Sequence, residues 1–426
     1  MVRFWLARFW LGLLIVAAVT GCASRPGPVA CAVEPFLVDV RDRVIPGRPV
    51  PEGFGRPSLR DLIERTEEAE LAPDTQQDRR TALALSGGGP WGAFGAGFLN
   101  AWDETQGLPR FDHVTGVSTG ALQAPFVFAG GPYLDRLEEL YRNIGNEGVL
   151  DERFLPFALV FRNGLNSLDP LRQTVRAEID RGLLEAILRR APGRTLTVGL
   201  VDLDSGELLG ADLIAAAERA LAEDGSEDCF VELLVASASV PVFFDPVAAR
   251  GSARLPEPRY LFVDGGVRAS VFLNEFEFAV RTAGMAMVRT PLGTLSPAPG
   301  ADRRAESPTD IYVIMNGKLG LSAQQTGGGI LSIAGRTLSN LVDEVSADAL
   351  YRIARTGETN GYCVRATYVE DRFTPCPPDD PDCGIDTSTV NFDRGFMRRL
   401  ADFGADYWTG ATAEPFLFQK GCARAD

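Results

Sequence analysis

The chain has 426 residues, of which 45% are hydrophobic and 23% charged, a balance typical of a folded globular protein with one large or two ordinary domains. It carries 42 basic and 57 acidic side chains, and this formal net charge of −15 argues against nucleic-acid binding. The single histidine, His113, excludes most zinc enzymes and makes any Ser-His-Asp triad depend on one residue.

The N-terminus has the pattern of an export signal. Arg3 and Arg8 supply positive charge, and residues 9–18 form an apolar stretch too short to span a bilayer by itself. The stretch Val19–Cys22 then resembles a bacterial lipoprotein cleavage box, which implies that Cys22 is lipidated and becomes the mature N-terminus. Because no Asp follows Cys22, resemblance to the sorting pattern of Gram-negative cells favours the outer membrane. The alternative is an ordinary signal peptide with an incidental cysteine.

Cysteine usage fits export to an oxidising compartment. Six cysteines remain after Cys22, enough for three disulfides whose connectivity the sequence does not determine. Cys376 and Cys383 flank a Pro/Asp-rich turn and are the best local pair. The acidic residues of this turn lack the EF-hand spacing, so we expect a solvated loop and no metal site.

Strand-like and helix-like segments alternate along the chain after a Pro/Gly/Arg-rich tether at residues 23–57. The patterns predict, in order, a helix at 58–71, a strand at 81–85, a helix at 94–102, a strand at 113–117, helices at 119–128, 134–141 and 168–190, a hairpin of 196–202 with 207–211, strands at 260–263 and 310–315, and a helix at 330–355. This alternation predicts an α/β sheet with helices on both faces.

The first of three notable loops is glycine-rich and lies between a predicted strand and helix. It reads Ser86-Gly-Gly-Gly-Pro-Trp-Gly92, and such a loop brings backbone N–H groups close to a phosphate or an oxyanion. Its glycines also match GxGxxG, but Asp112, at the spacing of a Rossmann acid, opens its strand instead of closing it. A P-loop is excluded because the loop has no lysine.

The second loop, Gly116-Val-Ser-Thr-Gly120, has the GxSxG pattern that exposes a serine hydroxyl at a sharp strand-to-helix turn. The candidate nucleophile is Ser118. His113 lies five residues earlier on the strand that leads to this serine, so we expect a buried histidine and not the catalytic base. A carboxylate must then serve as the base. The third loop reads Val263-Asp-Gly-Gly266, and its Asp264, at the end of the predicted strand, is the candidate.

The three loops in this order resemble the patatin-like phospholipases, or lipid acyl hydrolases. The resemblance extends from about Ala82 to Val267, and the segment 236–241 is similar to the one that precedes the aspartate strand in that family. It implies a three-layer α/β/α sheet and a Ser–Asp dyad, with Ser118 as nucleophile and Asp264 as base. It also implies that the oxyanion hole is formed by backbone N–H groups of Gly87, Gly88 and Gly89.

Together these features predict a phospholipase A-like lipid acyl hydrolase that needs no cofactor or metal, acts on lipid or phospholipid, and is held at the cell envelope by its N-terminal lipid anchor. The expected division is a signal peptide at 1–21, a tether and helix at 22–80, a catalytic core at 81–290 and a C-terminal part of the same domain at 291–426. The alternatives are a carboxylesterase for small soluble esters, a catalytically silent envelope lipoprotein and, least favoured, a nucleotide-binding oxidoreductase.

Overall fold

The fold is taken from a computed structural model of the chain. The structure describes residues 26–29, 31–39, 80–151, 164–222, 227–251, 258–273, 287–289, 295–297, 309–319, 330–376, 379, 385, 390–410 and 415–422.

A mixed sheet forms the centre of the molecule, with strand order β1-β5-β4-β3-β2-β10-β11-β12 and β7 pairing both β4 and β6. Its strands are β1 (Leu37–Asp39), β2 (Arg80–Leu85), β3 (His113–Val117), β4 (Thr195–Asp202), β5 (Glu207–Asp212), β6 (Val247–Arg250), β7 (Pro258–Asp264), β10 (Thr309–Ile314), β11 (Cys363–Thr367) and β12 (Phe418–Lys420). A separate pair consists of β8 (Met287–Arg289) and β9 (Leu295–Pro297).

The five central strands, β4, β3, β2, β10 and β11, run parallel, whereas β1, β5, β7 and β12 pair antiparallel to their neighbours. Parallel strands need both faces covered, and β2 shows this directly. Leu83 and Leu85 point into the larger core, and Ala82 and Ala84 into the core on the opposite face. Strands from both sides of residue 290 therefore share one sheet.

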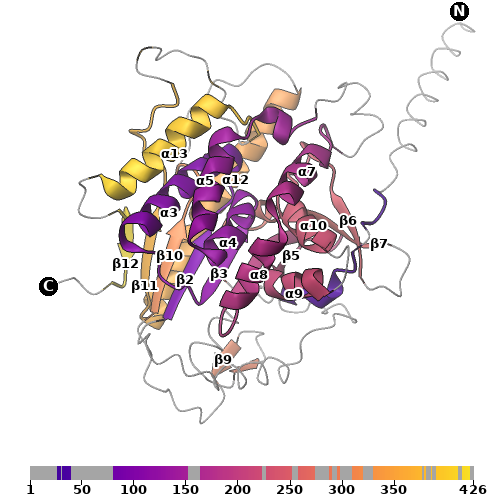
Figure 1. The fold of residues 1–426 in the computed structure, drawn as a ribbon, viewed down its shortest axis with the longest axis horizontal. Coiled ribbons are helices and arrows are strands. Elements are labelled where there is room, and N and C mark those ends of the chain that lie inside the picture. Colours follow the sequence, from indigo (N-terminus) through magenta and orange to yellow (C-terminus); the bar gives the residue numbers. More distant parts are fainter. Residues whose placement is uncertain are drawn as a thin grey trace, which may run out of the picture.

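Helices cover both faces of this sheet unequally (Figure 1). The larger core packs under α3 (Gly92–Gln106), α4 (Thr119–Ala129), α5 (Pro132–Asn143), α7 (Asp169–Glu178), α8 (Arg181–Arg190), α9 (Leu213–Ala222), α10 (Glu227–Ser237) and α13 (Arg394–Thr409). The smaller core packs under α12 (Ile330–Asn360). Short 3-10 turns occur at Glu34–Phe36, Gly89–Trp91, Asn146–Gly148 and Gly265–Val267. The predicted three-layer α/β/α architecture is confirmed.

The single long helix predicted at 168–190 is wrong, because α7 and α8 are separate helices. Ile179 leaves the helical conformation, and Asp180 begins α8 as its N-cap, its side chain accepting a hydrogen bond from the N–H of Leu183 at 2.8 Å. An aspartate that satisfies a free backbone donor favours a new helix start over continuation.

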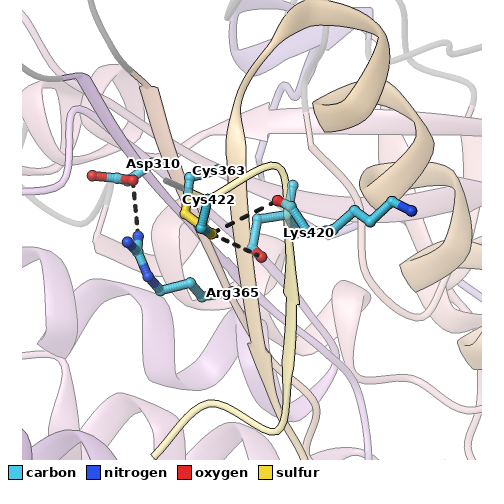
Figure 2. The surroundings of a disulfide bond; sticks show 6 residues. Asp310, Cys363, Arg365, Lys420 and Cys422 are labelled. Carbon is cyan, nitrogen blue, oxygen red and sulfur yellow. Dashed lines mark hydrogen bonds and ion pairs between the residues drawn. A yellow bond between two sulfur atoms is a disulfide. The ribbon is translucent and has the colours of Figure 1, made fainter. Parts of the chain in front are cut away.

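Two disulfides join distant parts of the described chain. Cys31, in the N-terminal segment, is bonded to Cys229 of α10. Cys363 of β11 is bonded to Cys422, just after β12, and Figure 2 shows this bond beside the ion pair of Asp310 with Arg365, whose atoms are 2.8 Å apart. These bonds attach both terminal segments to the sheet or its helices.

Several predictions concern residues outside this description. The signal peptide at 1–21, Cys22, most of the tether and the helix at 58–71 lie there, as does Cys383. Cys376 is in a disulfide, but its predicted pairing with Cys383 stays a prediction. Among the residues described, no helix has both the length and the apolar character needed to cross a bilayer.

Candidate active site

The sheet brings Ser118 and Asp264 together because two strands meet end to end along one edge of β4. Parallel β3 pairs with β4 as far as Val117, which lies opposite Gly199. Antiparallel β7 approaches from the other direction along the same edge, and its Asp264 lies opposite Leu200. Since Gly199 and Leu200 are adjacent, the residue after β3 and the last residue of β7 face each other.

Ser118 is held in a strained conformation at the turn between β3 and α4. Its backbone has φ 53° and ψ −121°, a positive φ that a non-glycine residue rarely adopts. Glycines allow the tight turn: a Cβ on Gly120 would lie 2.4 Å from the carbonyl oxygen of Leu85. Ser118 is buried and lines a pocket. Such strain at a serine in a sharp strand-to-helix turn is typical of a nucleophile elbow.

Asp264 is a buried carboxylate beside Ser118. The backbone N–H of Gly266 donates a hydrogen bond to its Oδ1 at 2.7 Å. Burial raises the pKa of Asp264 from 3.8 to about 6, although the Ser118 hydroxyl and the Gly266 N–H both favour the ionised form. A carboxylate with this pKa is ionised near neutral pH and is a stronger base than an exposed aspartate.

The glycine loop lies beside Ser118, but not all of its N–H groups are available. The N–H of Gly87 donates to the carbonyl oxygen of Ser270 at 2.8 Å, so Gly87 does not fit its predicted place in the oxyanion hole. Gly88 and Gly89 have positive φ angles of 155° and 57°. Within the described residues, their N–H groups donate no backbone hydrogen bond. The candidate donors are therefore narrowed to Gly88 and Gly89.

A buried polar network holds this loop in place. The Asn316 backbone N–H donates to Ser86 Oγ at 2.7 Å, and its side-chain amide donates to the Ser86 carbonyl and to Gln123 Oε1 at 2.8 and 3.0 Å. Gly88 packs so closely that a Cβ there would lie 1.8 Å from the Asn316 carbonyl oxygen. The segment just after β10 thus holds the glycine loop through Asn316.

Trp91, at a position where the patatin-like pattern commonly has arginine, packs away from this network. Its ring contacts Phe396 and Phe373 edge-on, with centroids 5.1 and 6.2 Å apart. The residue anchors the loop to α13 through aromatic contacts.

An apolar pocket of about 70 Å³ is lined by Ser118 and Gly89. Its apolar walls include Leu122, Phe126, Leu140, Ile144, Leu234 and Phe244. Such walls suit the hydrocarbon part of an ester whose carbonyl is at the serine.

His113 lies at the opposite end of β3 from Ser118. The strand has five residues, and at about 3.3 Å per residue its ends are roughly 15 Å apart. The imidazole is buried, with Nδ1 3.0 Å from Oγ1 of Thr195. This placement agrees with the expectation of a buried strand histidine. Asp112, the residue at the Rossmann spacing, accepts a hydrogen bond from the Thr81 N–H and links two strands.

Three residues with no predicted role contact the site through polar atoms: Asn316, Ser237 and Ser270. Asn316 carried a usable signal, since it comes just after a strand whose carboxyl end lies at the same sheet edge. Within the described residues, no group of three His, Cys, Asp or Glu side chains is arranged to hold a metal ion.

Comparison with known protein families agrees with this geometry. The sequence pattern of patatin-like phospholipases matches residues 83–276. This part of the chain belongs to the patatin-like phospholipase family. The matched region contains the glycine loop, Ser118 and Asp264, and the family assignment made from the motifs is confirmed. Membership implies lipid acyl hydrolase activity.

Two solved structures resemble this patatin-like chain distantly. VipD from Legionella pneumophila is 12% identical with a TM-score of 0.26, and the match covers 79% of this chain and 73% of VipD. Human GIVD cytosolic phospholipase A2 in complex with methyl gamma-linolenyl fluorophosphonate is 12% identical with a TM-score of 0.35, covering 81% of this chain and 60% of the human one. No curated protein sequence matches the chain.

Proposed function

We propose that this protein is a serine lipid acyl hydrolase that cleaves acyl esters through a dyad of Ser118 and Asp264. The observation that carries the proposal is the position of the strained Ser118 beside the buried carboxylate of Asp264, with Ser118 on the wall of an apolar pocket. A nucleophile placed beside its base meets the geometric requirement for covalent catalysis.

In the first step Asp264 takes the proton of the Ser118 hydroxyl while the serine oxygen attacks the ester carbonyl. The negative charge moves to the carbonyl oxygen, where the N–H groups of Gly88 and Gly89 would stabilise it by about 3 kcal/mol each. Asp264 then returns the proton to the departing alcohol, and an acyl-serine remains. Water, deprotonated by Asp264, attacks this acyl-serine and releases the fatty acid, and the proton returns to Ser118.

The apolar walls of the pocket favour esters with a hydrocarbon acyl chain over the alternative of small soluble esters. An acyl chain beyond the carbonyl would lie against apolar side chains such as Leu122, Leu234 and Phe244. Each methylene buried there contributes about 0.8 kcal/mol of binding, so turnover should rise with chain length until the pocket is filled.

The test is hydrolysis of a lipid panel by the purified mature chain, combined with labelling by a fluorophosphonate. We expect release of fatty acid, stoichiometric labelling of Ser118 and loss of both in Ser118→Ala. A chain that is neither labelled nor active on any ester would instead be a catalytically silent lipoprotein. Hydrolysis confined to short soluble esters would identify a carboxylesterase.

We further propose that the protein is lipid-anchored at the bacterial cell envelope, in the outer membrane, through Cys22. The lipoprotein-like box at Val19–Cys22 motivates the proposal, and the disulfides of Cys31 with Cys229 and Cys363 with Cys422 suit an oxidising compartment. Replacing Cys22 by Ser should release the protein from membranes or block its processing. Unchanged fractionation and unchanged mass of this variant would contradict the anchor.

A further inference from the structure

The end of α10 contacts the backbone of the candidate nucleophile. Ser237, the last residue of this helix, is fully buried. Its hydroxyl oxygen accepts a hydrogen bond from the N–H of Ser118 at 3.2 Å, and the same hydroxyl donates to the carbonyl oxygen of Gly199 at 2.6 Å. Because both its donor and its acceptor capacity are used, the hydroxyl is held in one orientation.

These two partners are the points on which the geometry of the dyad depends. Ser118 has the strained positive φ of 53°, so its backbone needs a contact that holds it there. Gly199 lies on the β4 edge where β3 and β7 meet. Gly265 packs so closely against it that a Cβ on Gly265 would lie 2.5 Å from the carbonyl oxygen of Gly199. The Ser237 hydroxyl therefore links the nucleophile turn to the strand that supports Asp264.

The residues after Ser237 contact the other half of the dyad. The Ser239 carbonyl oxygen accepts a hydrogen bond from the N–H of Asp264 at 2.9 Å. The Ser239 hydroxyl donates to the carbonyl oxygen of Ala236 at 2.8 Å, within its own turn. Val240 and Phe244 then line the apolar pocket. A single stretch of chain thus touches nucleophile, base and pocket.

We propose that Ser237 is a positioning residue, whose hydroxyl sets the place of the Ser118 backbone relative to Asp264 without touching substrate. The inference rests on the proposed dyad. If it holds, loss of this hydroxyl leaves the Ser118 N–H and the Gly199 carbonyl without their shared partner, and the nucleophile turn relaxes toward ordinary φ. Displacement of a nucleophile by about 1 Å lowers rates by roughly a hundredfold.

The experiment compares Ser237→Ala with Ser167→Ala, which removes another buried hydroxyl, one that hydrogen-bonds Asp169 at the start of α7. Steady-state kinetics on one soluble ester, fluorophosphonate labelling rates and thermal denaturation are measured for both. We expect Ser237→Ala to lower kcat and the labelling rate by roughly ten- to a hundredfold with KM changed less than about twofold. Ser167→Ala should keep kcat and the labelling rate within about twofold, whatever its melting temperature.

Equal losses of kcat in both alanine variants would overturn the proposal, because they would indicate general loosening of the fold. An unchanged kcat in Ser237→Ala would also overturn it. Should Ser237→Ala fail to fold, Ser237→Cys serves, since a thiol is a weaker donor and acceptor of similar shape. It should show a lower kcat than the natural protein at unchanged KM, and an unchanged kcat would refute the role. Activity surviving in Ser118→Ala would refute the dyad itself, which is a separate result.

Discussion

The two ends of β3 differ in what their buried polar groups do. At the amino end, His113 is buried beside Thr195, Asp112 accepts the Thr81 N–H, and the Arg194 guanidinium donates to the carbonyl oxygen of Phe111. At the carboxyl end, Ser118 lies beside Asp264 and lines a pocket. Both ends contain ionisable groups withdrawn from water.

Shifted pKa values occur at both ends, so they do not by themselves mark the active site. Burial lowers the pKa of Arg194 to about 9 and raises that of Asp112, just as burial raises that of Asp264. What distinguishes the carboxyl end is the strained serine, the glycine loop and the apolar pocket. Strain and an open pocket, added to a shifted pKa, separate a reactive end from a structural one.

The largest expected effect is the loss of activity when the dyad at the carboxyl end of β3 is changed. Ser118→Ala and Asp264→Asn should each lower ester hydrolysis by about a thousandfold or more, because each removes one member of the reacting pair. His113→Ala at the other end should leave kcat/KM of the folded fraction nearly unchanged. Circular dichroism of each variant checks the fold. Loss of activity in folded His113→Ala as complete as in Ser118→Ala would show that the dyad assignment is wrong.

The next largest effect is the pH dependence of activity, which depends on Asp264 at the carboxyl end of β3. Activity should fall about tenfold per pH unit below about 6, because protonated Asp264 cannot act as a base.

Stability should change in the opposite direction. Between the ordinary pKa of 3.8 and about 6 the folded state retains the Asp264 proton that the unfolded chain has released, so the free energy of unfolding contributed by this group falls as pH rises. Asp264→Asn should flatten this part of the stability profile in chemical denaturation. An identical profile in that variant would contradict the raised pKa.

At the amino end the expected effect is on stability. Arg194 is buried, its guanidinium lies 3.9 Å from the centre of the Phe128 ring, and it donates to backbone carbonyls. Arg194→Met should lower the free energy of unfolding by about 2 kcal/mol, because buried carbonyl oxygens lose their donor. The exposed Arg189 supplies the control, Arg189→Met, which should change stability by less than about 0.5 kcal/mol. Denaturant titrations measure both, and equal losses would contradict the structural role.

The smallest expected effect concerns the pocket. Leu122→Trp places a larger side chain on the pocket wall and should lower kcat/KM for long-chain esters by about tenfold, while a short-chain ester keeps its turnover. Leu221→Trp, at a half-buried position on α9 outside the pocket, is the matched control. A uniform loss for all chain lengths in Leu122→Trp would show that this wall does not contact the acyl chain.

The local features of the candidate site, and their order along the chain, could be predicted from the sequence. Turn chemistry around Ser118 and the strand-ending Asp264 could be predicted because glycines and apolar strands leave patterns within a few residues. The strand arrangement that brings Ser118 and Asp264 together was not predictable. The expectation was that the carboxyl ends of parallel strands lie at one sheet edge, whereas β7 runs antiparallel to β4 and its end faces the end of β3.

Non-local hydrogen bonds were likewise beyond the sequence. The N–H of Gly87, predicted to be an oxyanion donor, donates instead to the carbonyl oxygen of Ser270, which is far away along the chain. The bond between Ser237 and Ser118 spans 119 positions. A serine in an apolar helix end carries no signal of its partner, because any buried hydroxyl needs one and the fold decides which.

The disulfide of Cys31 has a mechanical consequence. Cys31 lies nine positions after Cys22, so in the anchored form proposed above the chain between them spans at most about 30 Å. The covalent bond of Cys31 joins it to Cys229 of α10, and this helix ends at Ser237, about 12 Å further along its axis. In that anchored form, tension on the N-terminus is carried covalently to the helix that contacts the candidate nucleophile, and the edge strand β1 is not on this path.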